Sequence, residues 1–252
     1  MKPKIGIIGI VSRDLDRDFS GTLARLRELG YQGIELTLDL IRKHGGPSAV
    51  GSALKAADME LVTIHTLREP LRDNLAEHLD ALAATGGKHI TISWAPLDSS
   101  ESVKQDADFY KSIAPAIHEA GARLCYHNHE HEFVVRLAGR HALHPLFEQT
   151  KGALDLHLDV AWATFGGANP VALLECYAGR IPIVHLKDFH DLTVRDCFTA
   201  LGTGLVDIAG CIRAAATTGV EWLVVEQDQP RRLTGFDLAT ASMLNLRDLS
   251  IP

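Results

Sequence analysis

Several features that would assign a protein to a specialised class are scarce in this sequence of 252 residues. It has four cysteines and no C-x-x-C pair, so a disulfide scaffold is not expected and a reduced compartment is the simpler interpretation. No apolar run approaches the roughly 20 residues of a membrane span, and no signal-peptide cleavage site follows the short apolar segment 5–11. Basic residues number 25 against 32 acidic ones, which argues against nucleic acid or anionic lipid as a partner. We therefore expect a cytoplasmic protein with neither a membrane nor a nucleic-acid partner.

A glycine-rich nucleotide fingerprint is also missing. The first apolar run continues as GIIGIVS, which is not the G-x-G-x-x-G that commonly follows the first strand of a doubly wound sheet. Hydrophobic residues make up 46% and charged residues 23% of the chain, as in an ordinary globular protein, so disorder is not expected. The one abundant residue of chemical interest is histidine, with 13 copies, since imidazole is the commonest metal-binding side chain.

The chain repeats a unit of apolar run followed by helical pattern. The first four runs begin at positions 5, 33, 61 and 89, a regular spacing of 28 residues, and four more begin at 122, 154, 181 and 222. Helical patterns fall at 19–29, 71–82, 103–120, 170–178, 206–218 and 236–246. Eight such units in about 250 residues predict an α/β fold of the (β/α)8 TIM-barrel type, forming a single domain over 1–252. A doubly wound open sheet is the structural alternative.

Ionisable residues collect where the apolar runs end. In a TIM barrel the carboxyl ends of the strands form the catalytic face, so the residues at these positions are the candidates for chemistry. Strand side chains alternate between faces, so Asp155, His157 and Asp159 are expected to share one face, which points into the barrel. The remaining run ends carry Glu35, His65, Ser93, Trp94, the segment 127–132, the segment 185–188 and Glu226.

A group of carboxylates at one barrel mouth needs a positive partner. A buried carboxylate costs several kcal/mol unless it is paired or bound to a metal ion. Each residue taken alone is more often a loop or capping residue than a ligand. Their convergence at one mouth favours a divalent cation held mostly by oxygen.

Three segments and one further glutamate resemble those of one known family. His127-Asn128-His129-Glu130-His131-Glu132-Phe133 is similar to an N-H-x-x-E-F signature, and Leu158-Asp159-Val160-Ala161-Trp162 to an Asp-x-x-Trp segment. His185-Leu186-Lys187-Asp188 resembles an H-x-K-D strand end, and Glu226 a terminal glutamate. These motifs resemble those of the sugar phosphate isomerase/epimerase family, the xylose isomerase-like TIM barrels, and of its N-H-x-x-E-F subgroup in particular.

The resemblance implies a ligand set. Asp159, His185 and Glu226 would bind one divalent ion, with Mn²⁺ expected and Mg²⁺, Co²⁺ or Zn²⁺ as alternatives. Glu132 is predicted as the fourth ligand because this subgroup has a glutamate there, and His127 is the substitute because it ends the fifth strand directly.

The resemblance also implies a reaction on a sugar or keto-sugar. Glu132 and Glu226 would act as the proton-transferring pair across a metal-stabilised enediolate. Many relatives have histidine where this chain has Trp162, so this ring is either a sugar-stacking surface or ordinary packing. The predicted substrate contacts are His65, His127, His129, Trp162 and Lys187.

Several alternatives stay open from the sequence. An isomerase or epimerase is the leading hypothesis, and a lyase, either inosose dehydratase-like or cleaving 3-keto-glycosides, would use the same site. A non-catalytic sugar-binding barrel and an endonuclease IV-like repair enzyme are the remote alternatives. Gly202-Thr203-Gly204 or Arg231-Arg232 would bind a substrate phosphate, although simple turn chemistry is the better explanation of the glycines. The sequence leaves homo-oligomer formation undecided.

Overall fold

A computed structural model describes residues 2–195, 197–227 and 234–249. Eight parallel strands close into a barrel in the order β1-β12-β9-β8-β5-β4-β3-β2. They are β1 (Lys4–Ile8), β2 (Gly33–Thr37), β3 (Glu60–Thr66), β4 (His89–Ile92), β5 (Arg123–His127), β8 (Asp155–Asp159), β9 (Ile183–Leu186) and β12 (Trp222–Glu226). The predicted TIM barrel is thereby confirmed, and every predicted apolar run overlaps a barrel strand.

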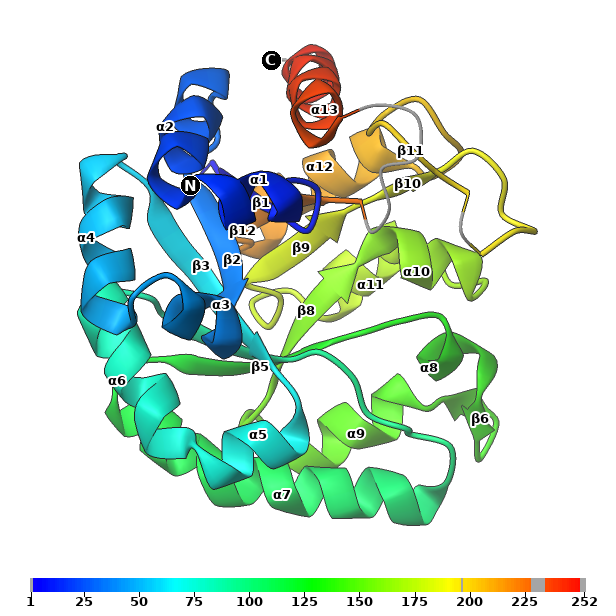
Figure 1. Cartoon of the computed structure of the whole chain (residues 1–252). Helices are drawn as coiled ribbons and strands as arrows, with labels where there is room; N and C mark the ends of the chain where they lie inside the picture. The colour runs from blue at the N-terminus through cyan, green and yellow to red at the C-terminus, as the bar shows by residue number, and fades with distance from the viewer. Residues whose placement is uncertain (1, 196, 228–233, 250–252) are drawn as a thin grey trace.

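Helices surround the barrel on its outside (Figure 1). The predicted helical segments correspond to α2 (Phe19–Leu29), α7 (Ser100–Glu119), α11 (Pro170–Cys176), α12 (Ile208–Thr218) and α13 (Gly235–Leu249). The others are α1 (Ser12–Arg17), α3 (Leu38–Lys43), α4 (Pro47–Ala56), α5 (Arg68–Asp73), α6 (Leu75–Thr85), α8 (His131–Val134), α9 (Leu143–Thr150) and α10 (Val160–Phe165). None of the helices in the described ranges is long and apolar enough to cross a membrane.

The structure has two helices, α5 and α6, where one helix was predicted over 71–82. The prediction of one continuous helix was therefore wrong. Helix α5 ends and α6 begins at Asn74, whose backbone is not helical (φ −132°, ψ 32°). The Asn74 side chain donates a hydrogen bond to the carbonyl of Pro70, and the ring of His78 contacts the carbonyl of Asn74. Such local side-chain bonds compete with the helical backbone pattern.

The strand alternation predicted for β8 is confirmed. Leu156 and Leu158 are fully buried in the main apolar core, whereas Asp155, His157 and Asp159 face polar groups of other strands. A separate apolar cluster of Val62, Ile183, Trp222 and Val224 comes from β3, β9 and β12.

Glycine is required where the Trp222 ring meets β2. A Cβ atom on Gly33 would lie 2.7 Å from the Trp222 ring and from Val62, closer than real Cβ contacts. Apolar packing therefore fills the barrel near the start of β12, while the polar side chains gather toward the carboxyl ends of the strands.

Candidate active site at the carboxyl ends of the strands

Three buried side chains and one partly buried glutamate converge at the carboxyl ends of β5, β8, β9 and β12. They form what we call the outer group: His127, Asp159, His185 and Glu226. One potential ligand atom from each lies within 4.8 Å of the others. The register explains part of this proximity, because Asp159 is directly opposite His185 on the neighbouring strand. Three of the four predicted ligands are thus brought together, and the fourth member is the predicted substitute, His127.

The oxygens of Asp159 have separate environments. Oδ1 accepts hydrogen bonds from the backbone N–H groups of Ala161 and Trp162, both at 2.8 Å, and so caps α10. Oδ2 lies 3.2 Å from Nζ of Lys187. The strand-to-helix turn that follows β8 therefore fixes the carboxylate and leaves one oxygen directed at the outer group.

Lys187 is a buried cation between two carboxylates. Its Nζ lies 2.9 Å from Glu226 Oε2 as well as near Asp159, and the residue is only 1% exposed. The ammonium group also lies 5.0 Å from the centre of the Trp162 ring. Two predicted substrate-binding residues, Trp162 and Lys187, are therefore next to the outer group.

A second cluster lies against the first and shares His185 with it. We call it the inner group: Glu35, His65, His157 and His185. Oε2 of Glu35 is 2.8 Å from Nε2 of His185 and 2.6 Å from Nε2 of His65, while Nδ1 of His185 is 2.8 Å from Oε2 of Glu226. His185 thus joins the two groups through its two ring nitrogens.

Burial and neighbouring charges shift several of these groups. Burial opposes a charge on His185, but the carboxylates of Glu35 and Glu226 outweigh it and raise the pKa of His185 to about 10. Burial raises the pKa of Asp159 to about 6, against the opposing effect of Lys187. Burial would also raise the pKa of Glu226, but Lys187 and His185 hold it well below its ordinary value. The cationic His185 and Lys187 therefore compensate the carboxylates of this region.

Glu132, the predicted fourth ligand, belongs to neither group. Its Oε1 accepts a hydrogen bond from the hydroxyl of Tyr126 at 2.6 Å, and its Oε2 accepts one from the backbone N–H of His129 at 2.9 Å. The residue lies in the short helix α8 and is fully buried. Burial raises the pKa of this carboxyl group.

The other residues of the histidine-rich segment have distinct roles. Asn128 joins β5 to β8: its side-chain amide donates to the carbonyl of Asp159, and its side-chain carbonyl accepts from the backbone N–H of Asp159. The His129 ring lies 5.0 Å from His127 and 5.9 Å from Trp162, between centres, and burial lowers its pKa to about 3. His131 contacts the carbonyl of Ala95.

An aromatic wall borders the site on the side of α10. The Trp162 ring packs edge-on against Phe165, Phe189 and Phe198, at 5.3 to 5.8 Å between centres, and is 4% exposed. Arg195 lies 4.9 Å from the same ring and pairs with Glu130 from the loop after β5. Packing accounts for most of the surface of Trp162.

The glycine-rich segment is explained by turn chemistry. The backbone N–H groups of Gly202, Gly204 and Val206 donate to the carboxylate of Asp188, which occupies the position a phosphate would need. Asp207 caps α12 by accepting from the N–H of Gly210. The alternative phosphate candidates, Arg231 and Arg232, lie outside the described residues.

Sequence reasoning missed the importance of Glu35 and His157. The sequence marks Glu35 only as the end of an apolar run, whereas the structure shows it in contact with His65 and with His185, the latter 150 residues away. The alternation of β8 predicts the face of His157 but no role for it. The signal for His157 was the alternation of Asp155, His157 and Asp159, three polar residues in a row on one face of a buried strand.

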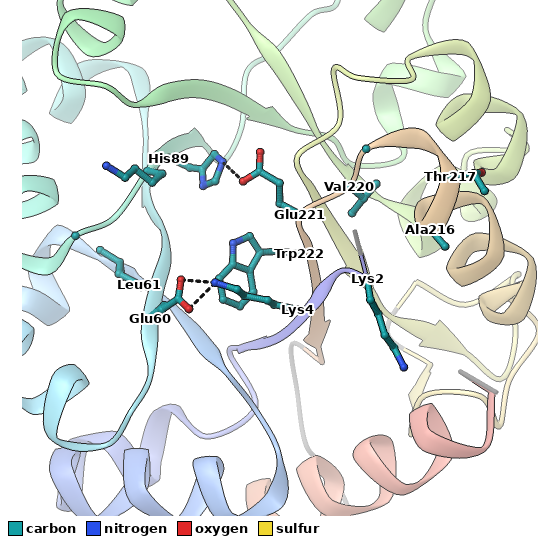
Figure 2. A pocket seen from close by; sticks show the side chains of 13 residues that line it. Lys2, Lys4, Glu60, Leu61, His89, Ala216, Thr217, Val220, Glu221 and Trp222 are labelled. Atoms are coloured by element: carbon teal, nitrogen blue, oxygen red, sulfur yellow. Dashed lines mark hydrogen bonds and ion pairs between the residues drawn. The ribbon is translucent and has the colours of Figure 1, made fainter. Parts of the chain in front are cut away.

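Cavities lie at both ends of the barrel. Beside the site, spaces of about 250 and 150 Å³ adjoin His65 with Ser93 and Glu35 with Ile8. A larger cavity of about 830 Å³ lies at the starts of β1, β3, β4 and β12, around Trp222 (Figure 2). TIM-barrel chemistry is found at the opposite, carboxyl-terminal end, where the buried ionisable groups of this chain converge.

Comparison with known proteins agrees with this architecture. The family described as xylose isomerase-like TIM barrel matches residues 23–248. An inosose dehydratase of Geobacillus kaustophilus is 28% identical over 248 residues, covering 88% of this chain and 77% of the relative. A crystal structure of a sugar phosphate isomerase/epimerase from Parabacteroides distasonis has a TM-score of 0.83 at 21% identity, covering 100% of this chain and 95% of the other. A crystal structure described as IOLI protein with a bound zinc atom has a TM-score of 0.75 at 14% identity, with 98% of both chains covered.

Proposed function

Because the chain belongs to the family of xylose isomerase-like TIM barrels, we propose that it is a metal-dependent enzyme acting on a sugar or keto-sugar. Its reaction begins with removal of a proton beside a carbonyl group. The observation that carries the proposal is the outer group, in which two imidazoles and two carboxylates meet at the catalytic end of the barrel. The zinc-containing structural relative and the sugar-processing relatives support it.

The residues present fit a divalent ion. Nδ1 of His127 has no hydrogen-bond partner within the described part of the chain, although the residue is 4% exposed, and burial holds its pKa well below the ordinary range. A neutral imidazole with a buried, unpaired nitrogen is a ready metal ligand. We propose that His127, Asp159, His185 and Glu226 hold Mn²⁺, with His127 in the position first predicted for Glu132. Both oxygens of Glu132 are already engaged by Tyr126 and His129.

Glu35 acts as a positioning residue in this scheme. When Nε2–H of His185 donates to Glu35, the other nitrogen, Nδ1, keeps its lone pair for a metal ion. A divalent ion at the outer group would polarise a substrate carbonyl and stabilise the negative charge that develops on its oxygen.

Glu226 is the proposed base. It lies at the end of β12 with its side chain 11% exposed, more than the other carboxylates of the two groups. Lys187 and His185 keep its pKa low in the metal-free protein, so the carboxylate is ionised there. Lys187 lies where it can bind a substrate hydroxyl group, or the side chain of Glu226 after Glu226 has accepted the proton.

We propose that a second group, Glu132, returns the proton to the substrate. Its raised pKa suits a general acid, and its hydrogen bond from Tyr126 orients it. His129, neutral and close to Trp162, is the alternative donor position. Trp162, His65 and His129 are the proposed substrate contacts around the metal position.

Two outcomes follow from the same first step. Return of the proton gives an isomerase or epimerase, whereas loss of a hydroxyl group β to the carbonyl gives a dehydratase. The inosose dehydratase similarity favours the second outcome and the sugar phosphate isomerase/epimerase similarity the first.

The test is incubation of Mn²⁺-loaded protein with a panel of keto-sugars and inososes in D₂O, followed by NMR. Deuterium incorporation with a shifted carbonyl position or an inverted centre identifies an isomerase or epimerase, and loss of water identifies a dehydratase. The matched control is Glu226→Gln, which keeps the side-chain shape but removes the base. Absence of exchange and of product for every compound in the wild-type protein would contradict the proposal.

A further inference from the structure

The inner group has a donor set that shares only His185 with the outer group. Glu35, His65, His157 and His185 come from β2, β3, β8 and β9, and one nitrogen or oxygen of each lies within 4.8 Å of the others. The side chains are at most 8% exposed. This makes a buried cluster of three imidazoles and one carboxylate.

Two atoms of the inner group lack a partner. Nε2 of His157 and Oε1 of Glu35 are both buried and have no hydrogen bond to any described residue. They face each other at 3.6 Å. Nδ1 of His157 is engaged with the hydroxyl of Thr91 at 3.2 Å, which in turn contacts the hydroxyl of Thr63 at 2.9 Å. Buried polar atoms without a hydrogen bond cost free energy, and a cation between these two atoms would satisfy both of them.

The donor chemistry distinguishes the inner group from the outer one. Three nitrogens and one oxygen match the tetrahedral sites of Zn²⁺, whereas carboxylate-rich sets suit Mn²⁺ and Mg²⁺. We propose that the inner group is a second metal site, selective for Zn²⁺, which competes with the outer group for His185.

The competition follows from the two nitrogens of one ring. The outer group uses Nδ1 of His185 and the inner group uses Nε2. A neutral imidazole has a single lone pair, so at neutral pH one ion is bound at a time. Zn²⁺ in the inner group therefore blocks Mn²⁺ in the outer group and acts as an inhibitor. The inference rests on the proposed function only for the role of His185 in the outer group.

The experiment uses chelator-treated full-length protein titrated with ZnCl₂ or MnCl₂ by calorimetry. His157→Gln should weaken Zn²⁺ binding by at least about tenfold, since even replacing a group that only supports a metal ligand costs about 10- to 100-fold. It should leave Mn²⁺ binding unchanged. Asp159→Asn should lose Mn²⁺ binding but keep the Zn²⁺ binding that His157→Gln weakens. In the wild-type protein, bound Zn²⁺ should raise the apparent Kd for Mn²⁺.

His65→Gln is the second variant, from a different strand, and should repeat the pattern of His157→Gln if the latter does not fold. Unchanged Zn²⁺ affinity in the folded variants would overturn the inner site. Equal loss of Zn²⁺ and Mn²⁺ binding would also overturn it, because the inner residues would then only orient His185. Simultaneous binding of both ions would overturn the competition. If Asp159→Asn bound Mn²⁺ as wild type does, while His157→Gln weakened Zn²⁺ binding, the outer site would be contradicted and the inner site supported.

Discussion

The two ends of the barrel use charged residues in opposite ways. At the amino-terminal end, charges are paired and face solvent: Lys4 and Glu60 are 44% and 56% exposed and lie 2.5 Å apart. Arg123 bridges Asp155 and Glu221 there, at 2.7 and 2.9 Å. At the carboxyl-terminal end, the charged side chains of the outer and inner groups are at most 11% exposed, and some of their atoms have no hydrogen-bond partner among the described residues.

We therefore call the amino-terminal end of the barrel the structural end, and the carboxyl-terminal end, with its two groups of ionisable side chains, the chemical end. Exposed ion pairs contribute about 0–1 kcal/mol each and need no ligand. Buried carboxylates and imidazoles without full pairing cost free energy in the unliganded protein, and a bound ion or substrate recovers that cost. Described residues around Trp222 line a cavity of about 830 Å³ (Figure 2). It is larger than the spaces of about 250 and 150 Å³ that described residues line beside the candidate active site.

The largest effect on the chemical end is expected from Glu226→Gln. A positioned proton-transfer group typically contributes about 10² to 10⁴ in rate, so turnover should fall by that factor at saturating metal and substrate. Steady-state kinetics of the Gln variant against wild type provides the measurement. Glu132→Gln tests the second member of the pair. Near-normal turnover in both variants would contradict the proposed pair of proton-transferring groups. His129 and Lys187 would then be the next candidates.

The largest effect on the structural end is expected from Trp222→Ala. Removing a buried tryptophan costs about 3–5 kcal/mol of unfolding free energy, because the ring packs against Gly33 and Val62. Chemical denaturation of the two proteins measures this loss. Turnover per folded molecule should be preserved, and a selective loss of turnover without loss of stability would contradict the division between the ends.

Only part of the candidate site could be predicted from the sequence. The strand ends at Asp159, His185 and Glu226 were predictable because the spacing of apolar runs locates the strands and the barrel brings their ends together. The place of Glu132 was not, because five residues after a strand the chain has already turned into α8, and Tyr126 and the His129 backbone hold the carboxylate there.

The contact between Glu35 and His185 was also beyond sequence reasoning. It joins β2 to β9, strands that are not neighbours in the sheet. It exists because the barrel closes, so that inward side chains from separated strands meet in its interior.

A pH effect of intermediate size is expected in metal-free protein. The pKa of His185 is raised to about 10 in the folded state from about 6.5 in an unfolded chain. The protonated ring therefore contributes stability that is complete below pH 6.5 and is lost as the pH rises through about 10. The melting temperature of wild type minus that of His185→Gln should shrink over this window. A difference that grows with pH would contradict the assigned charge.

The smallest effect is expected at the exposed pair of the structural end. Lys4→Met should change the unfolding free energy by less than about 1 kcal/mol, because both partners are largely hydrated. Adding salt should reduce the difference further. A loss of several kcal/mol in denaturation experiments would show that this end depends on its charges after all.

Two aspartates on β8 test the difference between the two ends of the barrel most directly. Asp159 and Asp155 share the inward face of β8, one at its carboxyl end and one at its start. Calorimetric titration with Mn²⁺ should give about one ion per chain for wild type and for Asp155→Asn. Asp159→Asn, which keeps the capping oxygen for α10, should lose most of its affinity. Equal Mn²⁺ binding by both variants would contradict the assignment of the metal site to the carboxyl end of the barrel.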